Sequence, residues 1–170
     1  MLGVKELSFV SSALPIGVNE VTPLEMATVQ ATLTNGGVRN DPYVIERIED
    51  VDGTVLYQHV PMPVVAVDSD VACQTMQVLA RSVRGGAAQA ADLGGRAAAG
   101  QRGFTGWFLD SWFVGSTPSL ATAVWIGPSS SNRTAAMTPE PGLADPAATW
   151  RQFNEAVHAD LPAKSFDGCS

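Results

Sequence analysis

Few residues in this chain of 170 are of the types, and at the spacings, that form a catalytic site or a metal site. The two cysteines, Cys73 and Cys169, lack the spacing of metal ligands. The two histidines, His59 and His158, lie far apart in the sequence with no cysteine partner nearby. No serine is paired with a suitably placed base, and no glycine-rich phosphate loop precedes a helix. We therefore expect neither a metal site nor a cofactor.

The cysteines leave two readings open. Either both are free thiols buried in the core, or a single disulfide joins Cys73 to Cys169 and ties the C-terminal tail to a helix. A disulfide would require an oxidising compartment, because the glutathione and thioredoxin of the cytosol keep thiols reduced.

One segment stands out because its side chains are unusually small. Residues 95–105 are rich in glycine and alanine and lack helical periodicity, which indicates either coil or a strand of small residues. Small side chains in a strand usually mean that another group approaches the backbone closely. The alternative is a tightly packed edge strand around Gly103.

Composition excludes several classes of function. Apolar residues make up 45% of the chain and charged residues 16%, which is typical of a protein that forms a core. Ten basic residues stand against 17 acidic ones, giving a net charge of −7, so we expect no nucleic-acid partner. No run approaches the roughly 18 apolar residues of a membrane span. The pair Lys5-Glu6 interrupts the position where a signal peptide would need apolar residues.

Three helices are predicted from capping residues and apolar spacing. The first begins at Thr22-Pro23 with a capping box and ends at Asn35, the second runs from Asp68 to Gly85-Gly86, and the third starts at Asp145-Pro146. Their predicted inner faces are Leu24, Met26, Ala27, Val29, Ala31 and Leu33; Ala72, Met76, Leu79, Ala80 and Val83; and Trp150, Phe153 and Val157.

Two hairpins are predicted between these helices. The first joins residues 43–48 and 54–57 through an acidic Asp-Gly turn, which lacks the later ligands of a calcium loop. The second joins residues 111–115 and 120–127, which are apolar on both faces, as in central strands covered on each side. The order of elements predicts an α+β fold with an antiparallel sheet.

Several motifs, in order, resemble the transpeptidase domain of class A penicillin-binding proteins. A helix that begins EVTPLEMA and ends at NGG is a signature of that family, and this chain has it in residues 16–27 and 33–37. The resemblance continues through residues 110–118 and 123–127 to the closing helix at 148–153. It implies a partial β-lactamase/transpeptidase-like fold with an extra β-hairpin. The single partial domain would comprise a scaffold (1–127), a loop (128–144) and a closing helix and tail (145–170).

The family's reaction is acyl transfer on peptidoglycan stem peptides that end in D-Ala-D-Ala, and it uses three motifs. A Ser-x-x-Lys turn supplies the nucleophile, a Ser-x-Asn loop a second hydroxyl, and a Lys-Thr-Gly strand faces the substrate. No serine of this chain has a lysine three positions later. Ser130-Ser131-Asn132 has the letters of the second motif, but it follows the last strand instead of preceding this region.

The third motif is recognisable by position and altered in content. Where family members read approximately GRPVAGKTGTT, this chain reads GRAAAGQRGFT. A neutral glutamine cannot supply the ammonium group that holds a substrate carboxylate. The arginine that follows faces the other side of the strand, because side chains alternate. The residues of this altered strand, which we predict as a degenerate substrate-binding segment, are Gln101, Arg102, Gly103, Phe104 and Thr105.

Two readings of the function follow from the resemblance. We favour a non-catalytic homologue, a binding or scaffolding module outside the cytoplasmic membrane. The alternative is the C-terminal half of an active transpeptidase, completed by a missing or separate N-terminal half. Expected partners are the stem peptide or that half, and apolar surface left uncovered would promote self-association. An extracytoplasmic location also favours the disulfide reading.

Four tryptophans resemble a glycan-binding set at first sight. Trp112, Trp125 and Trp150 fall on predicted strands or a helix at packing positions, so we expect them in the core. Trp107, in a glycine-flanked loop near the altered motif, is expected at the rim of a cleft.

Overall fold

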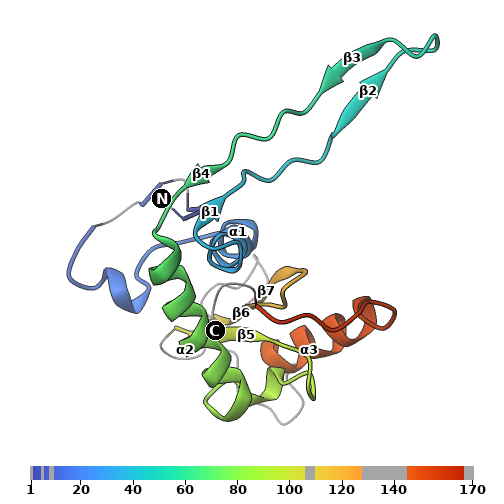
Figure 1. The fold of residues 1–170 in the computed structure, drawn as a ribbon. Helices are drawn as coiled ribbons and strands as arrows, with labels where there is room; N and C mark the ends of the chain where they lie inside the picture. The colour runs from blue at the N-terminus through green and yellow to red at the C-terminus, as the bar shows by residue number, and fades with distance from the viewer. Residues whose placement is uncertain (1, 5, 8–9, 106–109, 128–144, 167–170) are drawn as a thin grey trace.

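A three-stranded antiparallel sheet lies between two helices, and a long two-stranded arm extends away from it (Figure 1). The computed structural model describes residues 2–4, 6–7, 10–105, 110–127 and 145–166. The helical elements are η1 (Leu14–Ile16), α1 (Pro23–Thr34), α2 (Ser69–Gly85), η2 (Gln89–Ala91) and α3 (Pro146–Val157). The strands are β1 (Val38–Arg39), β2 (Arg47–Glu49), β3 (Val55–Gln58), β4 (Val64–Val65), β5 (Ala99–Phe104), β6 (Ser111–Ser116) and β7 (Ala121–Ile126).

The sheet has the strand order β5-β6-β7, and this architecture confirms the predicted α+β class. Helices α1 and α3 pack on β6 and β7, and α2 lies against β5. Phe113 of β6 contacts Trp150 of α3, with ring centroids 5.2 Å apart. The hydroxyl of Ser116, which points to the other face of β6, is bonded to α1. The two helices therefore cover opposite faces.

Small residues in β5 are needed because aromatic and backbone groups lie directly against them. A Cβ added to Gly100 would lie 2.6 Å from Cζ of Phe113 and 2.7 Å from the carbonyl oxygen of Val114. Ala98 and Ala99 are buried in the same strand region. The coil reading is thus wrong for residues 99–104, and the reading as a strand of small residues is confirmed; β5 lies at the edge of the described sheet, and the groups that approach it belong to β6.

Helix α1 begins as predicted, but its buried face is polar. Thr22 accepts a hydrogen bond from the Glu25 backbone N–H at 3.2 Å, and the Glu25 carboxylate accepts one from the Thr22 N–H at 2.9 Å, which completes the capping box. The predicted apolar face is wrong in part: Leu24 is 62% exposed and Ala31 is exposed, whereas Met26, Ala27, Val29 and Leu33 are half-buried. Apolar residues occur nearly all round this helix, so spacing could not identify the inner side. The buried residues are Thr28, Gln30 and Thr32.

The other two helices differ in how well their inner faces were predicted. In α2, Ala72, Met76 and Val83 are buried as expected. In α3, Trp150 is buried, but Phe153 is 47% and Val157 41% exposed, so that part of the prediction is wrong. The buried row of α3 runs instead through Ala147, Trp150, Asn154 and the C-cap His158.

Several polar groups on this row of α3 find partners close by, whereas Trp150 Nε1 and Asn154 Oδ1 have no hydrogen-bond partner among the described residues. The Asn154 side chain donates to the Trp150 carbonyl at 3.0 Å, which lets an amide take a position where an apolar residue was expected. His158 Nδ1 lies 2.9 Å from the Asn154 carbonyl, which only accepts, and Nε2 lies 2.8 Å from the Thr117 hydroxyl. The proton of a neutral His158 is therefore on Nδ1.

The first predicted hairpin forms, and it is longer than the sequence indicated. Strands β2 and β3 pair through a turn in which Gly53 adopts a φ of 82°. A second ladder, β1 with β4, pairs Val38 with Val65 and closes the base of the same hairpin. Its two-residue strands are too short for a periodic pattern to reveal. We call residues 40–63 the arm; Figure 1 shows them extending well away from the sheet and helices.

Candidate functional site

The altered strand is β5, which pairs on one side with β6 and lies against α2. Four of the five predicted residues lie on the strand itself, and Thr105 follows directly after it. Gln101 and Arg102 are neighbours in sequence, so their side chains point to opposite faces of the sheet. Their partners are the observation that decides what this strand can do.

Gln101 is held by a hydroxyl of α2. The Ser82 Oγ donates a hydrogen bond to Gln101 Oε1 at 2.9 Å. The side chain is thus a neutral amide that is oriented by the helix, and it contributes no positive charge at the position where the family motif has its lysine. A neutral amide can donate a hydrogen bond to a ligand, but it cannot match the charge-assisted bond that an ammonium group gives to a carboxylate.

Arg102 is engaged on the other face of the sheet. Its Nη2 lies 3.0 Å from Oδ1 of Asp145, the residue that caps the N-terminus of α3. The same carboxylate accepts a hydrogen bond from the Ala147 N–H at 3.0 Å. Arg102 therefore joins β5 to the start of α3. Its charge is neutralised there, on the face opposite to Gln101.

The end of β5 presents an aromatic ring where the family has a hydroxyl. Phe104 is 70% exposed. Gly103, opposite Trp112, would accept a Cβ at 3.7 Å from the Trp112 Cβ, an ordinary contact, so space alone does not require glycine there. Thr105 is bonded to the start of β6: its Oγ1 accepts from the Asp110 N–H at 3.0 Å and donates to Asp110 Oδ2 at 3.3 Å.

The tryptophans divide into buried and exposed positions. Trp150 is fully buried, which confirms its place in the core, and Trp112 is half-buried. The core prediction for Trp125 is wrong, because this residue is 43% exposed. Its indole N–H reaches Asp110 Oδ1 at 2.8 Å, so the exposed ring is anchored at the edge of β7. Trp107 lies outside the described residues.

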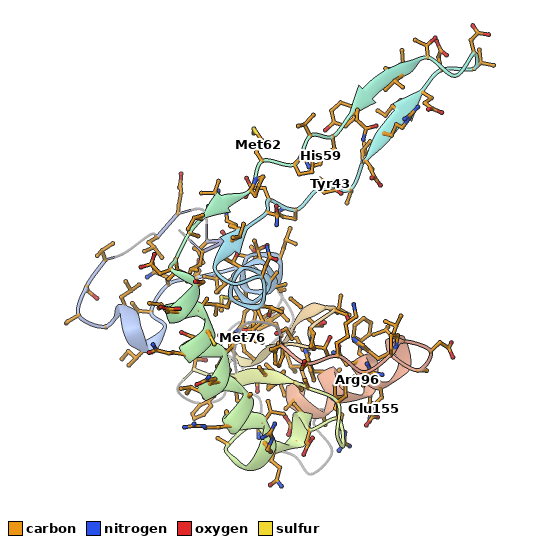
Figure 2. All side chains as sticks on the ribbon, in the orientation of Figure 1. Tyr43, His59, Met62, Met76, Arg96 and Glu155 are labelled. Atoms are coloured by element: carbon orange, nitrogen blue, oxygen red, sulfur yellow. The ribbon has the colours of Figure 1, made fainter. Side chains whose placement is uncertain are left out.

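Sequence reasoning missed a buried polar cluster between α1, α2 and the sheet. Gln30 Nε2 donates to Ser116 Oγ at 2.9 Å, and the hydroxyl of Thr34 lies 2.7 Å from the same oxygen. The sulfur of Met76 is 3.6 Å from Gln30 Nε2; Figure 2 shows Met76 on α2. The adjacent hydroxyl residues Ser116 and Thr117 at the end of β6 were the only hint of this cluster in the sequence, and a hydroxyl residue in a strand does not reveal its partner.

The structure describes only some of the residues of the remaining predicted sites. Cys73 is disulfide-bonded, and Cys169 lies outside the described residues, so the pairing of the two stays a prediction. Ser130, Ser131 and Asn132 also lie outside them. Within the described ranges there is no cluster of three or more metal-binding side chains. The helices in those ranges are too short or too polar to cross a membrane.

Taken together, β5 offers hydrogen-bonding groups and an exposed ring, but no charge that is free on the Gln101 face. The arrangement is suited to holding a chain segment through backbone and amide hydrogen bonds. It is not suited to deprotonating a nucleophile or to anchoring a carboxylate.

Comparisons with known proteins agree on one family. A family model described as the penicillin binding protein transpeptidase domain matches residues 3–128. Penicillin-binding protein 1A of Neisseria meningitidis is 36% identical over 136 residues, which cover 73% of this chain and 17% of that relative. The Aquifex aeolicus protein of the same name is 34% identical over 115 residues, covering 68% of this chain and 16% of the relative. The chain thus spans about a sixth of the length of these relatives.

Solved structures show the same fold. The PonA1 protein of Mycobacterium tuberculosis in complex with penicillin V superimposes with a TM-score of 0.81 at 23% identity, covering 92% of this chain and 43% of that one. Penicillin-binding protein 1A of Haemophilus influenzae gives a TM-score of 0.80 at 23% identity, covering 96% of this chain and 30% of that one.

Proposed function

Because the chain belongs to the penicillin-binding protein transpeptidase family, we propose that it is a non-catalytic transpeptidase-like domain of the cell envelope. In this proposal the chain has kept the scaffold that the family uses in peptidoglycan cross-linking and has lost the groups that perform the acyl transfer. Its ligand would be a peptidoglycan stem peptide, held without being cleaved.

The observation that carries the proposal is the pair of side chains at the centre of β5. Gln101 is neutral and bonded to Ser82, and the charge of Arg102 is paired with Asp145 on the opposite face. A substrate carboxylate near Gln101 would therefore meet no free cation from this strand. Proton transfer in the family's reaction also needs an amine close to the nucleophile, and a carboxamide cannot take up that proton.

The distribution of the altered residues supports the same proposal. No serine among the 170 residues is followed three positions later by lysine, so the chain cannot form an acyl-enzyme through the family's own turn. The scaffold motifs are intact while the departures gather on β5. That distribution is expected when selection maintains a fold after its chemistry is gone.

A second candidate is the C-terminal half of a working transpeptidase, completed by an N-terminal half on the same or a separate polypeptide. This candidate is favoured by the extent of the structural match, because 92% of this chain superimposes on only 43% of the solved PonA1 chain. Exposed apolar side chains on and before α1, such as Leu24 at 62% and Ile16 at 83%, are where such a half could pack.

The purified chain should not become covalently labelled by a fluorescent penicillin. The physical reason is the absence of a serine activated by a neighbouring lysine, without which opening of the β-lactam ring by the protein is slow. The measurement is in-gel fluorescence after denaturation, supported by intact mass. A stable adduct on any serine would contradict the proposal.

Two controls make the labelling experiment decisive. A catalytically active penicillin-binding protein, labelled in the same tube, shows that the reagent is intact. The chain denatured before exposure shows the background from exposed side chains. Labelling of the folded chain above that background would count as acylation.

A further inference from the structure

The arm is the part of the molecule that contributes least to its own core. Every residue from 40 to 63 is exposed except His59, which is half-buried. An isolated two-stranded hairpin is only marginally stable in water, because it has no second layer to pack against. Figure 2 shows Tyr43, His59 and Met62 on the arm, remote from Met76 and Arg96 in the body. The ring centroids of Tyr43 and His59 lie 3.7 Å apart in a stacked contact between the two sides of the arm.

Large apolar side chains on the arm face the solvent. Val44 is 100% exposed, Val51 98%, Met62 81% and Val60 70%. Ile48 and Tyr57 are paired across the strands and form an apolar patch on one face. Exposed apolar surface of this extent, on a part of the molecule with no core, is typical of an interaction site.

The arm also carries more than half of the net negative charge of the chain. Its 24 residues contain five acidic side chains and one basic one, a net charge of −4 out of −7 for the whole chain. Arg39 pairs with Asp41 at 3.1 Å, and Arg47 pairs with Glu49. Asp50 accepts hydrogen bonds from the N–H groups of Asp52 and Thr54 within the turn.

After those two ion pairs, Glu46, Asp50 and Asp52 keep their charge on the arm. Glu46 lies on the same face as Ile48, because side chains two positions apart in a strand share a face. This face therefore presents apolar groups beside a carboxylate, with the acidic turn at its end.

The backbone of the arm is open on both outer edges. Within the part of the chain that the structure describes, β2 and β3 pair only with each other. The His59 N–H donates to the Glu46 carbonyl at 2.8 Å, so residues 46 and 59 form a hydrogen-bonded pair. In an antiparallel ladder such pairs alternate with pairs whose N–H and C=O groups point outward. Arg47 and Gln58 therefore present free backbone groups to a third strand.

We propose that the arm docks an extended segment of a partner protein in which Lys or Arg residues alternate with apolar residues, and that this segment adds to the edge of β2 or β3. Strand addition satisfies the outward backbone groups, and the side chains on alternate positions supply charge and apolar contact. The negative charge of the arm favours a basic peptide over the other possible ligands. Nucleic acid and anionic lipid are repelled by a net −4, and a second copy of this chain would bring the same acidic arm.

The test uses a blocked eight-residue peptide of four Lys-Val repeats, titrated into the full chain at low and moderate salt. Binding should be detected by calorimetry and should weaken as salt is raised. A peptide of four Glu-Val repeats, which has the same strand propensity and the opposite charge, should not bind. Vesicles of anionic phospholipid should not bind either. Binding of either of these two probes as strong as that of the Lys-Val peptide would overturn the proposal.

Matched variants locate the interaction. Glu46→Lys with Asp52→Lys should weaken peptide binding by about tenfold or more, since two charges at the docking surface are reversed. Glu20→Lys with Asp160→Lys changes the net charge of the chain equally, away from the arm, and should leave binding within about twofold. Equal loss in both double variants would show that only net charge matters, and the proposal would be wrong.

Amide exchange distinguishes strand addition from loose attraction. With the peptide bound, exchange of the Arg47 or Gln58 amide hydrogen should slow by about tenfold or more, because its N–H gains a partner. The Tyr57 amide, which belongs to a hydrogen-bonded pair within the arm, should change little. Slowing at neither Arg47 nor Gln58 would overturn the proposal.

Discussion

Replacing Trp150 by alanine should lower the free energy of unfolding by about 3 to 5 kcal/mol. This is the largest effect we expect from shortening any one side chain. Trp150 is fully buried in the core cluster, where it meets Phe113 edge to face at 5.2 Å. Truncation removes this contact and leaves a cavity between α3 and the sheet. The measurement is denaturant unfolding followed by circular dichroism.

Phe153 is the matched control, because it lies on the same helix and is 47% exposed. Phe153→Ala should cost less than about 1 kcal/mol, since little of its surface is removed from water by folding. The two substitutions also test which row of α3 faces the core. An effect of Phe153→Ala equal to that of Trp150→Ala would contradict the packing described here.

Gly37→Ala should be the most damaging backbone substitution, with a loss of roughly 2 to 5 kcal/mol. Gly37 has a φ of 87°, which costs an L-residue energy, and an added Cβ would lie 2.1 Å from the carbonyl oxygen of Val67. The Gly37 carbonyl also accepts the N–H of Ala66 at 2.9 Å. Relief of the clash must therefore move the base of the arm away from the end of α1. Thermal unfolding and denaturant titration both measure the loss.

Gly36→Ala is the control that separates the cost of backbone strain from the cost of a steric clash. Its φ is 62°, but a Cβ there would have no atom within 4 Å. Gly36→Ala should cost only the conformational part, roughly 1 to 2 kcal/mol. If Gly36→Ala and Gly37→Ala are equally destabilising, the close approach of Val67 does not constrain the protein.

Local signals allowed much of the fold to be predicted. The capping box at Thr22 and Glu25, the glycine turn at Gly53 and the paired apolar runs of β6 and β7 each depend on residues close in sequence. Such signals fix where an element begins and ends. They do not fix which side of it is buried when apolar residues occur all round, as in α1.

The inner faces of α1 and α3 show why. Gln30 is buried because Ser116, far along the chain, receives its hydrogen bond, and Asn154 is buried because it bonds to the backbone of its own helix. A polar residue looks solvent-exposed in a sequence until its partner is known. Tertiary contacts supplied that partner, so the pattern of apolar residues alone was misleading.

For the candidate strand, the sequence identified the altered residues but could not identify their contacts. Strand alternation correctly placed Gln101 and Arg102 on opposite faces. Their partners, Ser82 and Asp145, come from separate elements that only the fold brings together. The length of the arm was missed for a related reason, since β1 and β4 have two residues each.

The most direct test of the central claim, that β5 has lost its chemistry, is to complete the domain and ask whether it reacts. The N-terminal half of the transpeptidase domain of an active relative is joined to this chain, either unmodified or carrying Gln101→Lys and Arg102→Thr. A third protein, in which the relative's own C-terminal half is rejoined, provides the positive control. Thermal unfolding verifies that all three fold, since Arg102→Thr removes the ion pair with Asp145.

Covalent labelling by a fluorescent penicillin is then compared among the three proteins. We predict labelling of the relative and of the Gln101→Lys/Arg102→Thr chimera, and none above background for the chimera with the unmodified strand. Equal labelling of the unmodified and the restored chimeras would contradict the account. The chain would then be the C-terminal half of a working transpeptidase.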